Sequence, residues 1–262
     1  MKIIKRIREI MGLSCNGIST RLLARVAHEP LMNRFDFLVA IARMVLPEYR
    51  FKWPQMDWWK IEWFTEYLIR FGEDKSFNSD RKWMVHQLMR LVGAVEGDTA
   101  ECGVYKGSTS WLVCRANKEA THARTHYVFD SFKGLSKPNE LDGRHWSEGD
   151  LSCVLDEVKT NLQEFDKVVF LEGWIPSRFG EVKERRFSFV HIDVDLYDPT
   201  KQSLEFFYPL LAPGGIMLCD DYGFETCPGA TKAMEEFFAD KSEKPVSLCG
   251  GGGFIIKGVK TI

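Results

Sequence analysis

Aspartates gather at the ends of two apolar runs in the C-terminal half of the chain. The segment "FVHIDVDLYDPT" contains Asp193, Asp195 and Asp198, and "CDDYG" places Asp220 and Asp221 side by side after a second apolar run. If the two runs are neighbouring parallel strands, which lie about 4.8 Å apart, these carboxylates converge. Such a cluster must bind protons or a cation. Hard oxygen ligands favour Mg²⁺, Mn²⁺ or Ca²⁺ over softer metals.

Two polar residues near this cluster have simpler explanations. Asp198 precedes Pro199 and a helical pattern, which is typical of an N-cap followed by proline at the first helical position. We therefore expect Asp198 to be structural. His191 shares a strand face with Phe187 and Phe189, and that position suits a core histidine as well as it suits a ligand.

A glycine-containing turn precedes the acidic segments. In "AECGVYKGSTS", an apolar strand runs into Gly103 and Gly107, and Ser108 or Thr109 can cap the helix that follows. Glycine lets a ligand approach the backbone closely, and a helix N-terminus attracts negative charge. One glycine of the dinucleotide pattern GxGxxG is absent. A cofactor loop and a plain tight turn both remain open at this point.

Two further candidates follow the next strands. Asp130 ends "YVFDS", where a carboxylate can accept hydrogen bonds from both hydroxyls of a ribose. The alternative for Asp130 is a helix or turn cap. Trp174 ends "LEGW", where its ring can stack on an adenine or lie at the rim of the core.

From about residue 98 onward, strand patterns alternate with helical ones. The strands are "DTAECGV", "THYVFDS", "KVVFLEGW", "FSFVHIDVD" and "GGIMLCDDY", with helices such as "TKQSLEFFYPLL" between them and two short strands, "PVSLC" and "GFIIKG", at the end. This alternation predicts βαβ units and a mainly parallel sheet. Ligands of such sheets bind outside the carboxyl ends of the strands, where every acidic segment falls.

The first part of the chain has a helical pattern without alternating strands. Residues 1–90 read as helices, and we expect them to form a helical cap or oligomerisation region beside an α/β domain at 91–262. Residues 1–13, "MKIIKRIREIMGL", combine an apolar stripe with a basic face and lack the apolar core of a signal peptide. The stripe suits docking on a partner subunit of a homo-oligomer. The basic face alternatively suits a membrane surface.

Composition excludes several classes of protein. The formal net charge of −2 argues against an extended nucleic-acid interface. No uncharged apolar stretch approaches the roughly 18 residues of a membrane-spanning helix. The seven cysteines include no CxxC pair, so we expect a reducing compartment, the cytoplasm, and no disulfide framework.

The motifs "AECGVYKGSTS", "VFDSFKGL", "FLEGW", "HIDVDLYDPT" and "LLAPGGIMLCDDYG" occur in this order. Together they resemble the macrocin O-methyltransferase (TylF-type) family over about residues 85–258. The resemblance implies a Rossmann-like class I methyltransferase fold, with a seven-stranded, mostly parallel sheet and helices on both faces. It also implies S-adenosylmethionine as methyl donor, a divalent cation, usually Mg²⁺, and a hydroxyl acceptor, often on a sugar of a natural product.

The resemblance also assigns roles to residues. Asp193, Asp220 and Asp221 match the metal ligands, and Asp195 matches the general base, so Asp193 and Asp195 are the expected catalytic pair. The positions expected to contact the cofactor are Glu101, Gly103, Val104, Gly107, Ser108, Asp130, Ser131, Gly173 and Trp174. The segment "SKPNELDGRHWSEGD" lies where such enzymes vary with their acceptor.

The implied chemistry is metal-assisted methyl transfer to oxygen. A metal lowers the pKa of the acceptor hydroxyl, and a nearby carboxylate removes its proton. The alternatives are an NAD-type oxidoreductase, a metal-dependent hydrolase of the same fold class, and a binding module without activity. Binding of S-adenosylmethionine rather than NAD would separate the methyltransferase from the oxidoreductase.

Overall fold

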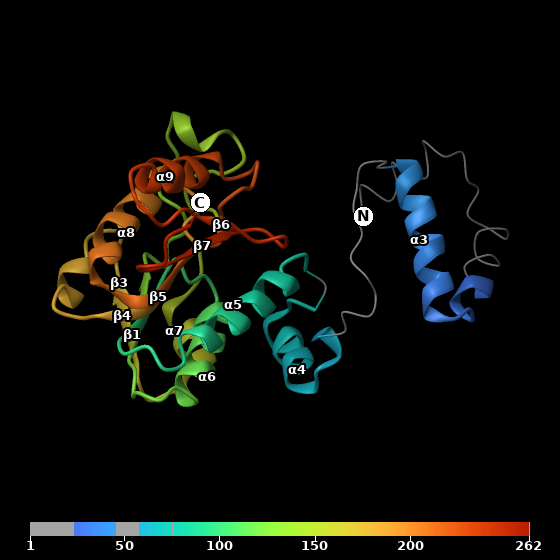
Figure 1. Ribbon diagram of the computed structural model, residues 1–262, viewed down its shortest axis with the longest axis horizontal. Coiled ribbons are helices and arrows are strands. Elements are labelled where there is room, and N and C mark those ends of the chain that lie inside the picture. The colour runs from blue at the N-terminus through green and yellow to red at the C-terminus, as the bar shows by residue number, and fades with distance from the viewer. Residues whose placement is uncertain (1–23, 46–57, 75, 262) are drawn as a thin grey trace. The chain divides into compact units, whose positions relative to one another are not determined.

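The computed structural model describes residues 24–45, 58–74 and 76–261 (Figure 1). The chain divides into two compact units between Thr65 and Glu66, and each unit is considered by itself. The helix expected at residues 1–13 lies outside the described residues. The domain boundary expected between residues 90 and 91 stays a prediction.

The described part of the first unit is helical. It contains helix α3, Leu31–Val45, and the short 3₁₀ helix η1, Trp58–Lys60. Helix α4, Glu62–Phe71, begins in this unit and continues into the second. The rings of Trp58 and Phe64 meet edge to face with centroids 5.7 Å apart, which is a favoured aromatic geometry.

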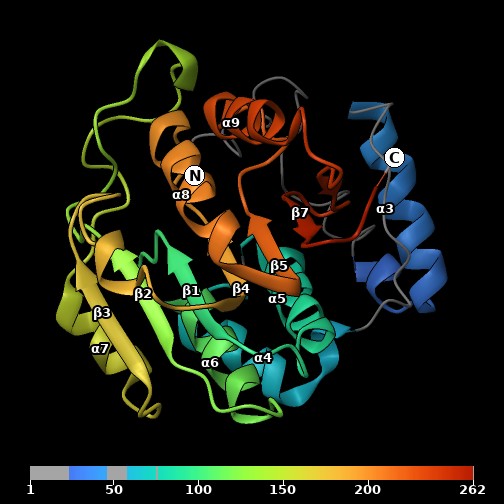
Figure 2. The same ribbon diagram turned by 60° about the vertical axis from the view of Figure 1, so that its left-hand side comes forward.

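Within the described residues of the second unit, seven strands form one sheet in the order β3-β2-β1-β4-β5-β7-β6 (Figure 2). Strands β1 to β5 pair in parallel, and β7 runs antiparallel to both β5 and β6. The mostly parallel sheet expected from the sequence is therefore confirmed. The strands are β1 Asp98–Cys102, β2 His126–Asp130, β3 Val168–Glu172, β4 Phe187–Ile192, β5 Leu211–Cys219, β6 Val246–Ser247 and β7 Gly253–Ile256.

Helices cover both faces of this sheet (Figures 1 and 2). Helices α5, Ser79–Leu91, α6, Ser108–Lys118, and α7, Leu155–Leu162, lie on one face. Helices α8, Tyr197–Leu210, and α9, Pro228–Phe238, lie on the other. Two short 3₁₀ helices occur in the connections, η2 at Glu140–Asp142 and η3 at Phe179–Val182. None of the helices in the described ranges is long and apolar enough to cross a lipid bilayer.

The central strands explain why the sequence contains continuous apolar runs. All six residues of β4 are buried, because helices pack against both sides of the strand. Beneath α8, Phe207 meets Phe129, Phe179 and Phe187 edge to face, with centroid distances of 5.6, 5.0 and 5.1 Å. This aromatic core fixes α8 to the sheet and so fixes the chain just before it, which carries Asp193 and Asp195.

The sheet order also locates the binding edge. From β1 the chain moves outward to β2 and β3 and then returns to β4, which pairs with β1 on its other side. The connections that leave β1 and β4 therefore diverge, and a crevice forms between them at the carboxyl ends of the strands.

The start of α8 differs from the sequence-based expectation. Asp198 was expected to cap a helix that starts at Pro199, but the helix begins two residues earlier, at Tyr197, after an extended Leu196. The Tyr197 amide donates instead to Oδ1 of Asp142, at 2.6 Å, and Asp142 is only 2% exposed. A buried carboxylate from a distant segment thus satisfies the helix terminus, so the N-cap position expected for Asp198 was wrong. Asp198 lies in the first turn of α8, where its Oδ2 accepts a hydrogen bond from Nδ2 of Asn139, at 3.0 Å.

Candidate active site

A cavity of about 740 Å³ lies at the carboxyl ends of the central strands. Its lining comes from the chain at the ends of β1, β2, β3, β4 and β5 and from α5. The lining includes most of the residues expected from the sequence: Gly103, Val104, Ser108, Asp130, Ser131, Gly173, Trp174, Asp193, Asp195, Asp220 and Asp221. The structure therefore places the expected cofactor loop and the expected metal ligands around one space. Glu101 and Gly107 do not line it.

Gly103 marks the closest approach of two strand ends. Its φ is +77°, and a Cβ added there would lie 1.7 Å from the backbone oxygen of Asp193. The amide of Asp193 in turn donates to the Cys102 carbonyl, at 2.8 Å. Only glycine fits this position, because any side chain would push apart the loop after β1 and the acidic end of β4.

Asp130 fastens the loop after β1 to the end of β2. Its Oδ2 accepts hydrogen bonds from the amides of Val104, at 2.7 Å, and Tyr105, at 3.2 Å, and its Oδ1 accepts from Phe132, at 2.7 Å. Burial raises the pKa of this carboxyl, and the three amides oppose that rise. The turn-cap role is thus observed. Each carboxylate oxygen has two lone pairs, so capacity to accept ribose hydroxyls remains.

The start of α6 was expected to be capped by Ser108 or Thr109. Instead Gly107 occupies the N-cap with a φ of +81°, and Ser108 is the first helical residue. A Cβ on Gly107 would lie 3.1 Å from Cγ1 of Val158 in α7. Gly107 is therefore needed for packing between helices, which explains why it is not part of the cavity lining. The Thr109 hydroxyl accepts a hydrogen bond from Lys82, at 2.5 Å.

Glu101 was expected to contact the cofactor, but its side chain is 1% exposed and points away from the cavity. Its Oε2 accepts a hydrogen bond from the Ser110 hydroxyl of α6, and its Oε1 lies 2.9 Å from Nδ1 of His191. The structure gives no support to a direct cofactor contact by this side chain. Residues alternate in direction along a strand, and Glu101 faces the helix layer.

His191 is a core residue beside the acidic cluster. It is fully buried, with Nδ1 at Glu101 and Nε2 3.6 Å from Oδ1 of Asp220. Burial lowers the pKa of the imidazole, but Asp220 and Glu101 overcome that effect and raise it to about 10. The 3.6 Å separation is too long for a good hydrogen bond. His191 thus belongs to the core and does not line the cavity.

The aspartates converge as the sequence predicted. One carboxylate oxygen from each of Asp193, Asp220 and Asp221 lies within 4.8 Å of the others. Burial and then the charge of Asp220 raise the pKa of Asp193 to about 6. Burial and the neighbouring carboxylates also raise the pKa of Asp221 well above its usual value. These carboxylates thus form a largely buried acidic cluster, which a bound cation would stabilise.

Asp195 lies beside this group in a strained conformation. Its φ is +60°, and its amide donates to Oδ2 of Asp221, at 2.8 Å. Its Oδ1 lies 3.6 Å from Sγ of Cys227, which in turn accepts a hydrogen bond from Nε1 of Trp146, at 3.4 Å. Burial and then Asp193 raise the pKa of Asp195 to about 7. A carboxylate with this pKa is suited to accept a proton near neutral pH, and strained backbone of this kind is common at functional sites.

These residues fit a divalent cation. The three converging groups are hard carboxylate oxygens, which Mg²⁺ and Mn²⁺ prefer, and two of the three carboxyls have raised pKa values. Asp220 differs from them: burial would raise its pKa, but His191 and Arg81 hold it below its usual value.

Sequence reasoning missed two cationic residues of the cavity, Arg81 and Lys82 of α5. Lys82 is 8% exposed and lies on the buried face of the helix with Val85 and Met89. Lys82 precedes Val85 by three residues and Met89 by seven, which is the spacing of one helix face. This spacing could have shown from the sequence that Lys82 faces inward. Nη1 of Arg81 pairs with Oδ2 of Asp220, so Arg81 contacts an expected metal ligand directly.

The chain is similar in sequence to known O-methyltransferases. A family model described as macrocin-O-methyltransferase (TylF) matches residues 81–247. The tetracenomycin-type enzyme 8-demethyl-8-(2,3-dimethoxy-alpha-L-rhamnosyl)-tetracenomycin-C 4'-O-methyltransferase of Streptomyces olivaceus is 32% identical over 154 residues, covering 53% of this chain and 58% of that protein. Mycinamicin III 3''-O-methyltransferase of Micromonospora griseorubida is 31% identical, covering 52% and 59%. Each match thus spans under two thirds of the relative.

Two solved structures share the architecture. The calicheamicin methyltransferase CalS11 superposes with a TM-score of 0.63 at 19% identity, covering 88% of this chain and 95% of that one. The O-methyltransferase NovP superposes with a TM-score of 0.56 at 25% identity, covering 68% and 79%. The fold is therefore that of class I methyltransferases, as expected from the sequence.

Proposed function

Because the chain belongs to the macrocin-O-methyltransferase (TylF) family, we propose that it transfers a methyl group from S-adenosylmethionine to a small-molecule hydroxyl, assisted by a divalent cation. One observation carries the proposal: a single cavity joins the glycine loop after β1 to the converging aspartates of β4 and β5. Methyl transfer to oxygen requires a donor, an acceptor and a base in one space, and this cavity offers all three places.

We propose that the methyl donor binds along the ends of β1, β2 and β3. Gly103 lets a ligand approach the backbone, and Asp130 holds the loop that Gly103 begins. Ser131, Gly173 and Trp174 extend the same wall. When bound, S-adenosylmethionine supplies a methyl group that is already activated, so these residues need only bind and orient it.

The acidic cluster would act on the acceptor. Asp193, Asp220 and Asp221 are the residues that would hold a divalent cation, Mg²⁺ or Mn²⁺. When bound, the cation supplies Lewis acidity that lowers the pKa of a hydroxyl. Asp195 then accepts the proton of that hydroxyl at its carboxylate, for which the raised pKa of about 7 is suitable.

We propose a sugar as the acceptor. The name of the Streptomyces olivaceus relative includes a rhamnosyl group. In this chain the cavity extends past the aspartates to Trp146, Asp198 and Gln202. An aromatic face beside hydrogen-bonding side chains is the usual composition of a pocket that holds a polar ring. Trp146 and the Asp142 cap both belong to the segment "SKPNELDGRHWSEGD", which was expected to vary with the acceptor.

Two alternatives are disfavoured. An NAD-type oxidoreductase does not account for the aspartate cluster, and a metal-dependent hydrolase does not account for the glycine loop and Asp130 in the same cavity. A homo-oligomer, in which residues 1–13 mediate assembly, and a cytoplasmic location remain further proposals. Deleting residues 1–13 and measuring mass by light scattering tests the role in assembly.

The experiment that tests the proposed function has two stages. S-adenosylhomocysteine should raise the melting temperature of the purified protein, whereas NAD should not. Radiolabelled S-adenosylmethionine should then transfer label to members of a panel of glycosylated natural products and nucleotide sugars, and EDTA should stop the transfer. Calorimetry without heat for either sulfur cofactor would refute the methyltransferase, and full turnover in metal-free enzyme would refute the role of the cation.

A further inference from the structure

The aspartate cluster already has a cation against it, supplied by the chain. Arg81, on the first turn of α5, pairs through Nη1 with Oδ2 of Asp220, and the same nitrogen lies 3.3 Å from the Asp220 carbonyl oxygen. The side chains of Arg81 and Asp220 are 17% and 7% exposed. A pair so shielded from water is weakened little by salt, unlike the ion pairs of an open surface.

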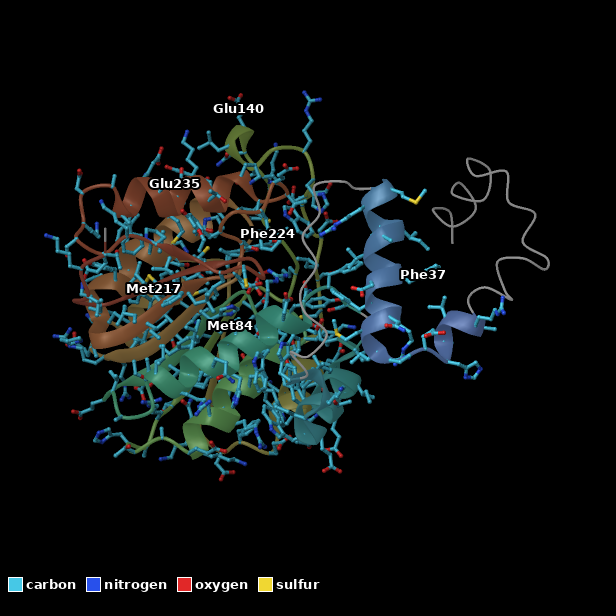
Figure 3. The ribbon with its side chains drawn as sticks, turned by 45° about the vertical axis from the view of Figure 1, so that its right-hand side comes forward. Phe37, Met84, Glu140, Met217, Phe224 and Glu235 are labelled. Carbon is cyan, nitrogen blue, oxygen red and sulfur yellow. The ribbon has the colours of Figure 1, made fainter. Side chains whose placement is uncertain are left out.

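The guanidinium is held by three partners, so its position at the cluster is defined. Nη2 donates to Oδ1 of Asn78, at 2.6 Å, one turn earlier in the chain. The guanidinium carbon also lies 4.9 Å from the ring centroid of Phe224, the residue labelled in Figure 3 in the connection after β5. This geometry is a cation–π contact. Arg81 thus bridges α5 and the segment that carries Asp220.

A divalent cation in the cluster would share the Asp220 carboxylate with Arg81. The two oxygens of Asp220 have different neighbours: Oδ2 pairs with Arg81, and Oδ1 lies 3.6 Å from Nε2 of His191. A cation bound by Asp193, Asp220 and Asp221 would lie about 2.1 Å from an Asp220 oxygen if it is Mg²⁺. It would therefore meet the guanidinium at a distance where like charges repel strongly.

We infer that Arg81 is a tethered counter-charge, which neutralises Asp220 in the metal-free protein and must leave that carboxylate when a divalent cation binds. The inference rests on the proposed function, because it concerns the same metal site. The burial of the cluster explains why Arg81 would have this role. Burying carboxylates without a nearby cation costs free energy of folding. Arg81 lets the domain fold before the metal arrives, and it lowers the affinity of the site for metal in exchange.

The opposite role is also conceivable for an arginine in this place. Arg81 could hold the Asp220 carboxylate in the orientation that a metal requires, as residues behind metal ligands often do. The two roles predict opposite effects on metal affinity. Removing a competitor tightens metal binding, whereas removing a support weakens it.

The test titrates Mn²⁺ into the chelator-treated full chain and follows free Mn²⁺ by electron paramagnetic resonance. Arg81→Met removes the charge but keeps an apolar stem, and we expect it to bind Mn²⁺ at least tenfold more tightly than the unmodified protein. Arg81→Lys, which retains a charge, should change the affinity less. Arg90→Met is the matched control, because Arg90 lies on the same helix, is exposed and is not part of the cavity lining. It should leave the affinity unchanged.

A second variant covers the case in which Arg81→Met fails to fold. Asn78→Ala keeps both charges and removes one anchor of the guanidinium, so it should tighten Mn²⁺ binding by a few fold. The melting temperature of the metal-free Arg81→Met protein should fall, and Mn²⁺ should raise it by more than it raises that of the unmodified protein. Equal or weaker Mn²⁺ binding by Arg81→Met, or by Asn78→Ala if only that variant folds, overturns the inference.

The outcomes also separate this inference from the proposed function. If the unmodified protein binds Mn²⁺ and Arg81→Met binds it no better, only the competing role of Arg81 is lost. If no variant binds Mn²⁺, the inference and the metal-dependent part of the proposed function both fail. Binding of S-adenosylhomocysteine, measured on the same samples, then still decides whether the chain has the expected cofactor.

Discussion

Replacing Gly103 with alanine tests the close approach of the loop after β1 to the end of β4. The added Cβ would lie 1.7 Å from the Asp193 backbone oxygen, where ordinary contact begins at 3.4 Å. The obstructing atom belongs to the backbone, so no side-chain rotation relieves the clash. One of the two segments must therefore move by roughly the missing 1.7 Å. The φ of +77° adds strain of its own for a residue with a Cβ.

The size of the effect follows from these two contributions. A left-handed backbone costs a non-glycine residue about 1–2 kcal/mol. Overpacking in a rigid region adds about 1–3 kcal/mol, so Gly103→Ala should reduce the free energy of unfolding by about 2–5 kcal/mol. Gly258→Ala is the matched control, since its φ is +82° and an added Cβ would meet nothing within 4 Å. It should cost only the backbone part, about 1–2 kcal/mol.

Urea denaturation of both variants in metal-free, cofactor-free form measures these losses. Gly103→Ala should also weaken binding of both S-adenosylhomocysteine and Mn²⁺, because the displaced segments border the expected sites of both. Gly258→Ala should weaken neither. A loss of stability in Gly103→Ala no larger than that in Gly258→Ala, with unchanged ligand binding, would show that the loop is not packed as described.

Three further predictions concern caps, acid stability and catalysis. Asp142→Ala should cost about 1–2 kcal/mol in urea unfolding, because it removes the buried cap of α8, whereas Asp198→Ala should cost less than about 0.5 kcal/mol. Burial raises the pKa of Glu243, but hydrogen bonds from the Gly258 amide and the Ser242 hydroxyl outweigh burial and lower this pKa to about 2. This lowered folded-state pKa gives stability that is present above the unfolded pKa of about 4.3 and is lost as pH falls towards 2. Glu243→Gln should therefore flatten the acid limb of the stability profile, and an unchanged limb would contradict this assignment. Asp195→Asn should lower turnover by roughly 10²-fold or more while leaving Mn²⁺ affinity nearly intact, and a parallel loss of both would make Asp195 a ligand rather than a base.

Much of the fold was predictable because its signals are local. The alternation of strand and helix patterns predicted the parallel sheet, and the acidic residues at strand ends predicted a cluster that the structure forms from Asp193, Asp220 and Asp221. Residues that follow parallel strands necessarily meet at one edge. For that reason, spacing along the sequence was enough to bring these carboxylates together.

The failures share a different cause, since each depends on a distant partner. The cap of α8 comes from Asp142, 55 residues from its amide donor, so a suitable local residue, Asp198, was chosen instead. The cofactor contact of Glu101 stays a prediction, but its carboxylate lies against His191 and Ser110, two partners that are also distant in the sequence. Arg81 lies in the part of the sequence that was predicted to be a separate helical cap. In the structure, α5 packs on α6, and Arg81 reaches Asp220.

Mn²⁺ binding by two matched variants tests whether the buried aspartates hold a divalent cation. Asp221→Asn removes an expected ligand, whereas Asp198→Asn changes an aspartate that lines the same cavity but belongs to α8 and lies outside the cluster. We predict one Mn²⁺ per chain in the unmodified protein and in Asp198→Asn, and an affinity at least about 100-fold lower in Asp221→Asn. Absence of Mn²⁺ binding to the unmodified protein, or equal affinity in the two variants, would contradict the account.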